Sequence, residues 1–367
     1  MKRLVEIGLL YSQEGSYAPL TRACRNGALL GIQDVNANPD LALELVAVER
    51  DPKCNIDLYE PLCTDILRNS TARHVIGCVT SWSRKEVIPG LERAGGTLWY
   101  PSPYEGFEAS DHVVYTHACP NQHLLPLLNW TFPRFGRQGY LTGSNYIWGW
   151  EMNRVARAVI TEHGGEVLGE RYLPIGDTDV DRMLAEIKIA RPNFILNSLI
   201  GGSSYAFLKA YAKLGREDPY FTAPTCPVLS CNLTESELTY IGTAAEGLIS
   251  AGPYFVGWKS WPQGPRHDFT SSFEAAAYSA VRTLALLLNG RPGAENEKLA
   301  DLLQSPNADQ TMIDVETHHT TLPVLIAQVT NGAFEVLQSW EDIPADPYLT
   351  HPDRLPQDVQ PKLTVIK

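Results

Sequence analysis

The sequence lacks any apolar run long enough to cross a membrane, because no stretch approaches the roughly 18 apolar residues of a spanning helix. The chain begins Met-Lys-Arg-Leu-Val-Glu-Ile-Gly-Leu-Leu. A secretory signal needs a longer apolar stretch and a small-residue cleavage site, and Glu6 interrupts this run. We therefore interpret it as a buried strand that ends near Leu10, and we expect a cytoplasmic protein. The alternative is a periplasmic protein whose signal peptide has been removed.

Cysteine is sparse and has no repeated spacing. The seven cysteines are an odd number, they form no Cys-x-x-Cys motif, and no His/Cys cluster has zinc-ligand spacing. We expect reduced, mostly buried thiols, with a Cys54–Cys63 disulfide as the alternative. The pair His318-His319 does not predict a metal site, because neighbours in an extended segment point to opposite faces. We expect neither a metal nor a cofactor.

Basic residues are fewer than acidic residues. The 30 Lys and Arg residues are outnumbered by 42 Asp and Glu residues, which gives a formal net charge of −12. This balance argues against direct binding to nucleic acid or to an anionic membrane, and it is compatible with a neutral ligand.

The common catalytic motifs are also missing. The sequence contains no Gly-x-Ser-x-Gly elbow, Walker loop, Gly-x-Gly-x-x-Gly or His-Glu-x-x-His. No nucleophile and base stand at a recognisable spacing. We therefore predict that the protein is not an enzyme; an amidase is the enzymatic alternative.

What is present is a repeated alternation of strands and helices. At 367 residues the chain exceeds what one core normally serves, so we expect two domains. In the first third, strand-like runs at 4–10, 41–48, 74–78 and 97–100 alternate with helical patterns at 21–36, 57–69 and 83–94. The pattern restarts with strands at 139–142, 166–173 and 193–198 and helices at 148–163, 179–190 and 203–214. The sequence thus predicts an α/β fold with two doubly wound parallel-sheet lobes.

The last third has a different character. A helix with an apolar face runs from Phe273 to Leu287 and ends at Asn289-Gly290. Two β-runs, 324–329 and 333–337, flank Thr330-Asn331-Gly332, and Asn-Gly between β-runs predicts a hairpin. The proline-rich stretch from Pro344 to Pro361 is expected to wrap the surface or to stay irregular.

Three segments that follow predicted strands carry polar and aromatic side chains. The first, Tyr100-Pro-Ser-Pro-Tyr-Glu-Gly-Phe-Glu108, holds Ser102 between two prolines. The second, Gly77 to Lys85, leads a strand into a helix that Ser81 or Ser83 is expected to cap. The third, Gly143 to Gly149, places Tyr146 and Trp148 at the start of another helix. Because carboxyl ends of strands face the crevice of such sheets, these segments predict a ligand site. Aromatic packing and ordinary helix caps are the alternatives.

These same segments, with Pro120-Asn-Gln122 and Asp346-Pro-Tyr348, carry a family resemblance. The chain resembles the aliphatic-amide receptors that negatively regulate bacterial amidase operons, and their relatives, the urea and short-chain-amide binding proteins of ABC transporters. Both have the type I periplasmic-binding-protein fold. The similarity extends from Ile7 to about Tyr348, and the Tyr-Pro-x-Pro-Tyr-Glu-Gly run is its most specific element.

The resemblance implies a bilobed clamp with a multi-crossover hinge. One lobe would hold 1–120 and 252–325, the other 121–251 and 326–367, with a small amide between them. The ligand-binding residues that it implies are Ser81, Tyr100, Ser102 and Tyr104 on the first lobe and Tyr146, Trp148 and Asn232 on the second. Glu105 is expected to accept a hydrogen bond from the amide NH2 if it points inward.

This chain departs from the family pattern at several positions. Val79 stands where the amide receptors carry an aromatic residue, Trp148 where they carry tyrosine, and Ser102 replaces a threonine. Asn232 and Leu233 occupy positions where hydroxyl residues are usual. The ligand is therefore expected to differ in size or polarity from a simple amide.

The resemblance implies a cytoplasmic sensor that sequesters an RNA-binding antiterminator and releases it when an acetamide-like ligand binds. The alternative is an extracytoplasmic solute-binding protein of an ABC transporter for urea, short-chain amides or branched-chain amino acids. In both cases the partner is a small neutral amide or urea-like ligand, without direct contact to nucleic acid or membrane. The sequence leaves open whether the protein forms a homo-oligomer.

Overall fold

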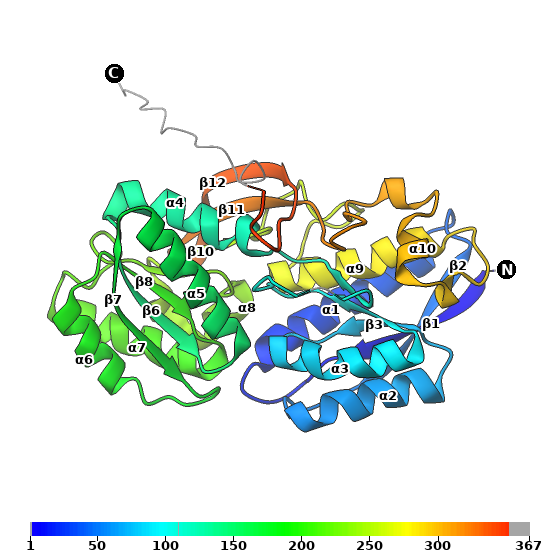
Figure 1. The fold of residues 1–367 in the computed structure, drawn as a ribbon, viewed down its shortest axis with the longest axis horizontal. Helices are drawn as coiled ribbons and strands as arrows, with labels where there is room; N and C mark the ends of the chain where they lie inside the picture. The colour runs from blue at the N-terminus through cyan, green and yellow to red at the C-terminus, as the bar shows by residue number, and fades with distance from the viewer. Residues whose placement is uncertain (1, 109, 352–367) are drawn as a thin grey trace, which may run out of the picture.

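Two α/β lobes lie side by side in the computed structural model, which describes residues 2–108 and 110–351 (Figure 1). The first lobe has a parallel five-stranded sheet of order β2-β1-β3-β4-β5. Its strands are β1 (Arg3–Leu10), β2 (Leu43–Arg50), β3 (His74–Gly77), β4 (Thr97–Tyr100) and β5 (Val113–Tyr115). Its helices are α1 (Ala18–Ala37), α2 (Tyr59–Asn69), α3 (Ser81–Ala94), α9 (Ser272–Leu288) and the short α10 (Leu299–Leu303).

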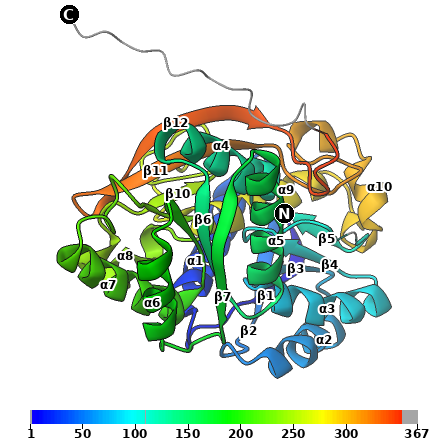
Figure 2. The ribbon, with the colours of Figure 1, turned by 60° about the vertical axis from the view of Figure 1, so that its left-hand side comes forward.

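The second lobe is built on a seven-stranded sheet of order β12-β11-β10-β9-β8-β6-β7. Its strands are β6 (Gln138–Ser144), β7 (Glu166–Leu173), β8 (Phe194–Ser198), β9 (Val228–Ser230), β10 (Ile249–Gly252), β11 (Leu322–Thr330) and β12 (Ala333–Ile343). Its helices are α4 (Leu124–Phe135), α5 (Ile147–Glu162), α6 (Asp181–Ala190), α7 (Gly201–Glu217) and α8 (Glu235–Ile241). Strand β11 pairs antiparallel with both β10 and β12, and β11 and β12 form a curved ribbon at one edge of the sheet (Figure 2).

Most of the predicted elements are present in the structure. The strands at 97–100 and 166–173 are confirmed to the residue, and the other predicted strands and helices are found with ends shifted by a few positions. The predicted hairpin is also present, with Asn331 and Gly332 both at positive φ in its turn. Three helices were not predicted from the sequence, namely α4, in which Pro133 interrupts the helical pattern, and the short α8 and α10; the short strands β5, β9 and β10 were not predicted either.

Three crossings of the chain connect the lobes, and hydrogen bonds tie the first crossing to the third, to the end of β12 and to α9. The first crossing follows β5, the second follows β10 and the third precedes β11. The side-chain amide of Gln122, in the first crossing, donates to the carbonyl oxygens of Thr320 (3.0 Å) and Ile343 (2.8 Å). Thr116 Oγ1 donates to the carbonyl of Ala276 in α9 (3.3 Å). The predicted limits of the lobes stay a prediction; β11, which begins at Leu322, lies wholly in the second sheet.

Within the first lobe, helices α1 and α9 pack at very short range. A Cβ at Gly27 would lie 1.9 Å from the carbonyl oxygen of Glu274, and one at Gly31 would lie 2.9 Å from Cβ of Val281. Alanines on the facing side of α9 allow the same approach, and the buried contact holds α9 onto the first lobe although it follows β10 of the second.

All seven cysteines are free, and six of them are buried. Among the described residues, no helix is both long enough and apolar enough to span a membrane.

Gly27→Ala tests this close helix contact. The added methyl group would meet backbone that cannot rotate away, so α1 and α9 must separate; we expect unfolding free energy to fall by about 1–3 kcal/mol or more. Urea denaturation measures the loss. Gly202→Ala in α7 is the matched control, because a Cβ there meets nothing within 4 Å. Equal stability of the two variants would contradict the close packing.

Candidate functional site

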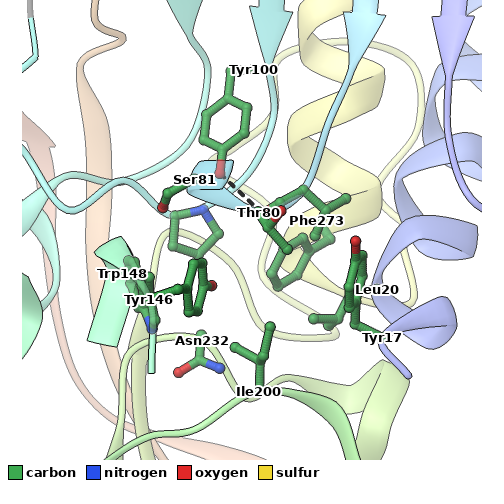
Figure 3. A pocket seen from close by; sticks show the side chains of 12 residues that line it. Tyr17, Leu20, Thr80, Ser81, Tyr100, Tyr146, Trp148, Ile200, Asn232 and Phe273 are labelled. Carbon is green, nitrogen blue, oxygen red and sulfur yellow. Dashed lines mark hydrogen bonds between the residues drawn. The ribbon is translucent and has the colours of Figure 1, made fainter. Parts of the chain in front are cut away.

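A small cavity lies between the two lobes, where the carboxyl ends of strands from both sheets meet (Figure 3). Its atom-free space is about 340 Å³ including its mouth, but the centre of a water-sized sphere reaches only about 20 Å³ of it. The cavity therefore suits a very small ligand. The residues that line it are Tyr17, Leu20, Val79, Thr80, Ser81, Tyr100, Pro103, Tyr146, Trp148, Ile200, Asn232 and Phe273.

Four of the lining residues share one structural position: each is the N-cap of a helix. They are Tyr17 of α1, Thr80 of α3, Tyr146 of α5 and Ile200 of α7. The N-terminus of a helix carries partial positive charge and backbone N–H groups without partners inside the helix. Four such ends around one cavity favour an electron-rich group, such as a carbonyl oxygen, and disfavour a cation.

Local sequence explains how α3 begins at the cavity. Thr80 is extended and accepts a hydrogen bond from the N–H of Ser83 (3.2 Å), while Ser83 Oγ accepts from the N–H of Thr80 (3.2 Å). The prediction that Ser81 or Ser83 caps the helix was wrong, because Thr80, not either serine, has the extended backbone of the cap. Ser81 becomes the first helical residue, and its hydroxyl is free to bond elsewhere.

Two hydroxyls on the first lobe have their protons committed away from a ligand. Ser81 Oγ donates to Glu105 Oε2 at 2.7 Å, and the Tyr100 hydroxyl donates to the carbonyl oxygen of Val79 at 3.0 Å. Both side chains line the cavity, as Figure 3 shows. A hydroxyl that donates its single proton to the protein has only lone pairs left for other partners. The first lobe thus offers hydrogen-bond acceptors to a ligand.

On the second lobe, Trp148 offers the opposite polarity. Its indole Nε1 is buried and has no hydrogen-bond partner in the described structure, and the residue lines the cavity across from Ser81 (Figure 3). A buried N–H without a partner costs about 1–3 kcal/mol, so a ligand acceptor that reaches it would gain free energy. Asn232 lies on the same side, but its amide donates to the carbonyl of Leu199 and accepts from Ser230 Oγ (both 3.2 Å).

The structure brings five of the eight predicted ligand-binding residues to the cavity: Ser81, Tyr100, Tyr146, Trp148 and Asn232. It places the other three, Ser102, Tyr104 and Glu105, behind the lining of the described cavity. Their ligand-binding role has no support in this geometry, and their partners explain why.

Each of the three turns toward the protein. The Ser102 hydroxyl is fully buried and lies 3.5 Å from the carbonyl of Cys78. The Tyr104 ring packs on Tyr115, and its hydroxyl bonds to the backbone of Glu108. The carboxylate of Glu105 points at the protein, where one oxygen accepts from Ser81 Oγ and the other from Arg84 Nη2.

The cavity also has lining residues that the sequence analysis did not assign to the site. These are Tyr17, Leu20, Thr80, Pro103, Ile200 and Phe273, besides Val79, which was noted only as a departure. Tyr17, Thr80 and Ile200 share the N-cap position, so a search for helix starts after predicted strands would have found them. Phe273 comes from α9, and no local signal places that helix beside β3 and β4.

Charged side chains are absent from the described lining, but a charged cluster lies directly behind it. Arg84 is fully buried and pairs with Glu105 (2.7 Å) and Glu108 (2.9 Å), and its guanidinium lies 4.8 Å from the ring centres of Tyr100 and Tyr104. Burial opposes its charge, but the carboxylates outweigh burial, so the pKa of Arg84 is raised. Burial likewise works against ionised Glu108, yet Arg84 and Lys85 lower its pKa to about 2.

The lobes are in contact around the cavity, so this is a closed form. A Cβ at Gly201 in α7 would lie 2.2 Å from the carbonyl oxygen of Ser16 in the first lobe. The rings of Trp82 and Tyr146 meet across the gap with 5.8 Å between centres. Both contacts lie beside residues that line the cavity. No group of described His, Cys, Asp or Glu residues could hold a metal ion.

The chain belongs to the periplasmic binding protein family, because a family model described as a periplasmic binding protein domain matches residues 5–354. The predicted α/β fold of the type I kind is thereby confirmed.

Solved structures are similar over nearly the whole chain. An ABC-transporter solute-binding protein from Rhodopseudomonas palustris HaA2, solved with p-hydroxybenzoic acid, has a TM-score of 0.79 at 20% identity and covers 93% of this chain and 98% of its own. The branched-chain amino acid binding protein LivJ from Streptococcus pneumoniae, solved with isoleucine, has a TM-score of 0.74 at 17% identity, covering 92% and 99%. The leucine-binding protein LivK from Thermotoga maritima MSB8 has a TM-score of 0.74 at 15% identity, covering 92% and 99%. Identities this low show the fold alone.

The pH dependence of stability tests whether burial holds His123, in the first crossing beside the site, in its neutral form. His123 caps α4 in the first crossing; its Nδ1 accepts from the N–H of Leu124 (2.7 Å), so its Nε2 donates to the carbonyl of Tyr104 (3.1 Å). Burial lowers its pKa to about 4. Above pH 6.5 both folded and unfolded chains hold it neutral; as the pH falls toward 4, only the unfolded chain takes up the proton, so stability is lost.

We expect His123→Gln to reduce the loss of unfolding free energy between pH 7 and pH 4 by on the order of 3 kcal/mol. Urea denaturation at the two pH values measures it. His267→Gln, at an exposed position, is the control. An unchanged pH dependence in His123→Gln would mean that this histidine is not held neutral.

Proposed function

We propose that this member of the periplasmic binding protein family is a receptor that encloses one small uncharged solute carrying an amide or urea group. The observation that carries the proposal is the opposite hydrogen-bond polarity of the two walls. The second lobe offers an unpartnered donor, Trp148 Nε1, and the first lobe offers acceptors at Ser81 and Tyr100. An amide presents one carbonyl acceptor and one NH2 donor group, which match these walls.

The same arrangement favours closure around such a ligand. A carbonyl oxygen that accepts from Trp148 bonds to the second lobe, while the NH2 group donates to Ser81 and Tyr100 on the first. A ligand that bonds to both walls binds the closed form better than the open one, and so shifts the equilibrium toward closure. The apolar side chains of Leu20, Ile200 and Phe273 also line the cavity, and they suit a short apolar tail.

Amino acids fit this cavity less well. The ammonium group of a free amino acid needs a carboxylate or several acceptors, and the four helix N-termini disfavour a cation there. The nearest carboxylate, Glu105, is occupied by Arg84 and Ser81. Leucine or isoleucine, the ligands named for two of the similar structures, are therefore not the solutes that we propose.

Two biological roles use such a receptor. The similar solved structures favour the first, a solute-binding component of an ABC transporter. The second, a sensor that releases an RNA-binding antiterminator when an amide binds, rests on the Tyr100–Glu108 segment and its resemblance to the amide receptors. Cell fractionation distinguishes the roles, because the first requires an extracytoplasmic protein and the second a cytoplasmic one.

Thermal melting with single solutes tests the proposed ligand class. We expect acetamide, butyramide, formamide or urea to raise the melting temperature, because a ligand at a hundred times its Kd adds about 2.7 kcal/mol to the folded state. Leucine and benzoate are the comparison solutes. A rise with leucine or benzoate and none with any amide or urea would refute the proposal.

Trp148→Phe tests the donor on the second lobe. The phenyl ring keeps an apolar wall but removes the N–H, so we expect acetamide affinity to fall about tenfold with little change in stability. Isothermal titration calorimetry measures the affinity. Trp340→Phe is the matched control, because its Nε1 is also buried and unpartnered but lies outside the described lining. Equal affinities in the two variants would remove Trp148 from the site.

A further inference from the structure

A chain of three side chains connects the wall of the cavity to a fully buried cation. Arg84 Nη2 donates to Glu105 Oε1 at 2.7 Å, and Glu105 Oε2 accepts the proton of Ser81 Oγ at 2.7 Å. All three residues are at most 1% exposed. Of the three, only Ser81 lines the cavity.

We propose that Glu105, held by Arg84, is a positioning residue that makes the site select an amide over the carboxylate of the same shape. It acts through Ser81: by accepting the only proton of that hydroxyl, it leaves lone pairs toward the ligand. The inference rests on the proposed function, since it concerns which small solute the same cavity takes.

The physical reason is that acetamide and acetate differ mainly at one position. Acetamide has an NH2 group that donates to a lone pair, whereas acetate has an oxygen that only accepts. Four helix N-termini alone would favour the anion, so selection against a carboxylate requires an opposing element. Lone pairs of Ser81 that face a carboxylate oxygen repel it and leave it without a hydrogen bond.

Glu105 is held in this role by its own surroundings. The buried charge of Arg84 keeps one oxygen of Glu105 engaged, and the rings of Tyr100 and Tyr104 flank the guanidinium. An ionised carboxylate accepts hydrogen bonds and cannot donate them, so Ser81 must be the donor in its bond to Glu105. A glutamine in the same place would offer its oxygen to Arg84 and its NH2 to Ser81, which would turn the serine proton toward the ligand.

Glu105→Gln therefore tests the inference by calorimetric titration with acetamide and with acetate. We expect the ratio of acetamide affinity to acetate affinity to fall about five- to tenfold. This is the change in affinity that reversing the direction of one hydrogen bond should cause. The matched control is Glu108→Gln, which removes the other carboxylate on Arg84 and the same charge but has no contact with Ser81. The control is expected to keep the ratio within twofold.

A double-mutant cycle separates positioning through Ser81 from a general structural effect. In a Ser81→Ala background, Glu105→Gln is expected to leave the ratio unchanged, because the hydroxyl through which it acts is gone. If Glu105→Gln does not fold by thermal melting, Ser81→Ala carries the test: loss of the acceptor should lower the ratio, by a smaller factor than reversal of the bond, and an unchanged ratio overturns the role of Glu105, which acts through that hydroxyl.

The outcomes distinguish the two proposals. Wild-type protein that binds neither acetamide nor any other amide or urea contradicts the proposed function itself. Wild-type protein that prefers acetamide, with a ratio that Glu105→Gln leaves unchanged or that Glu108→Gln lowers equally, overturns only the role of Glu105.

Discussion

The direction of the parallel strands is the constraint on which the site depends. In a parallel βα unit, the helix starts where the strand ends, so helix N-termini collect at the carboxyl edge of the sheet. Here two such sheets turn these edges toward each other, and the N-caps of α1, α3, α5 and α7 meet at one cavity. The electrostatic character of the site thus follows from connectivity before any side chain is considered.

Side chains then give the two walls their different hydrogen-bond polarity. On the first lobe, protein acceptors take the protons of Ser81 and Tyr100; on the second, the indole of Trp148 keeps its N–H unpaired. A solute that donates at one end and accepts at the other links the lobes, while the hydrogen bonds of Gln122 and Thr116 hold the first crossing to Thr320 and to α9. Binding and closure are therefore one event in this account.

How much of this was predictable depends on the range over which each interaction acts. Local signals sufficed for the strand at 97–100 and for the Asn331-Gly332 turn. The pattern of apolar residues along a strand and the residue types of a turn involve only a few neighbouring positions. Four residues of the cavity lining, Ser81, Tyr100, Tyr146 and Trp148, were proposed because they lie at or just after the ends of predicted strands, whereas Asn232 was implied by the family resemblance alone. The orientation of Glu105 was left open because its partners, Ser81 and Arg84, lie 24 and 21 positions earlier, and only the fold decides whether a carboxylate points at them or at a ligand. Phe273 was missed for the same reason, since α9 returns to the first lobe after the whole second sheet.

The most direct measurement is a crystal structure of the complex with thioacetamide, in which anomalous scattering from sulfur marks the carbonyl end of the ligand. The account predicts sulfur beside Trp148 Nε1 and the NH2 group beside Ser81 Oγ and the Tyr100 hydroxyl, with the lobes closed. A ligand outside this cavity, or one whose sulfur faces Ser81 and whose NH2 group faces Trp148, would contradict it.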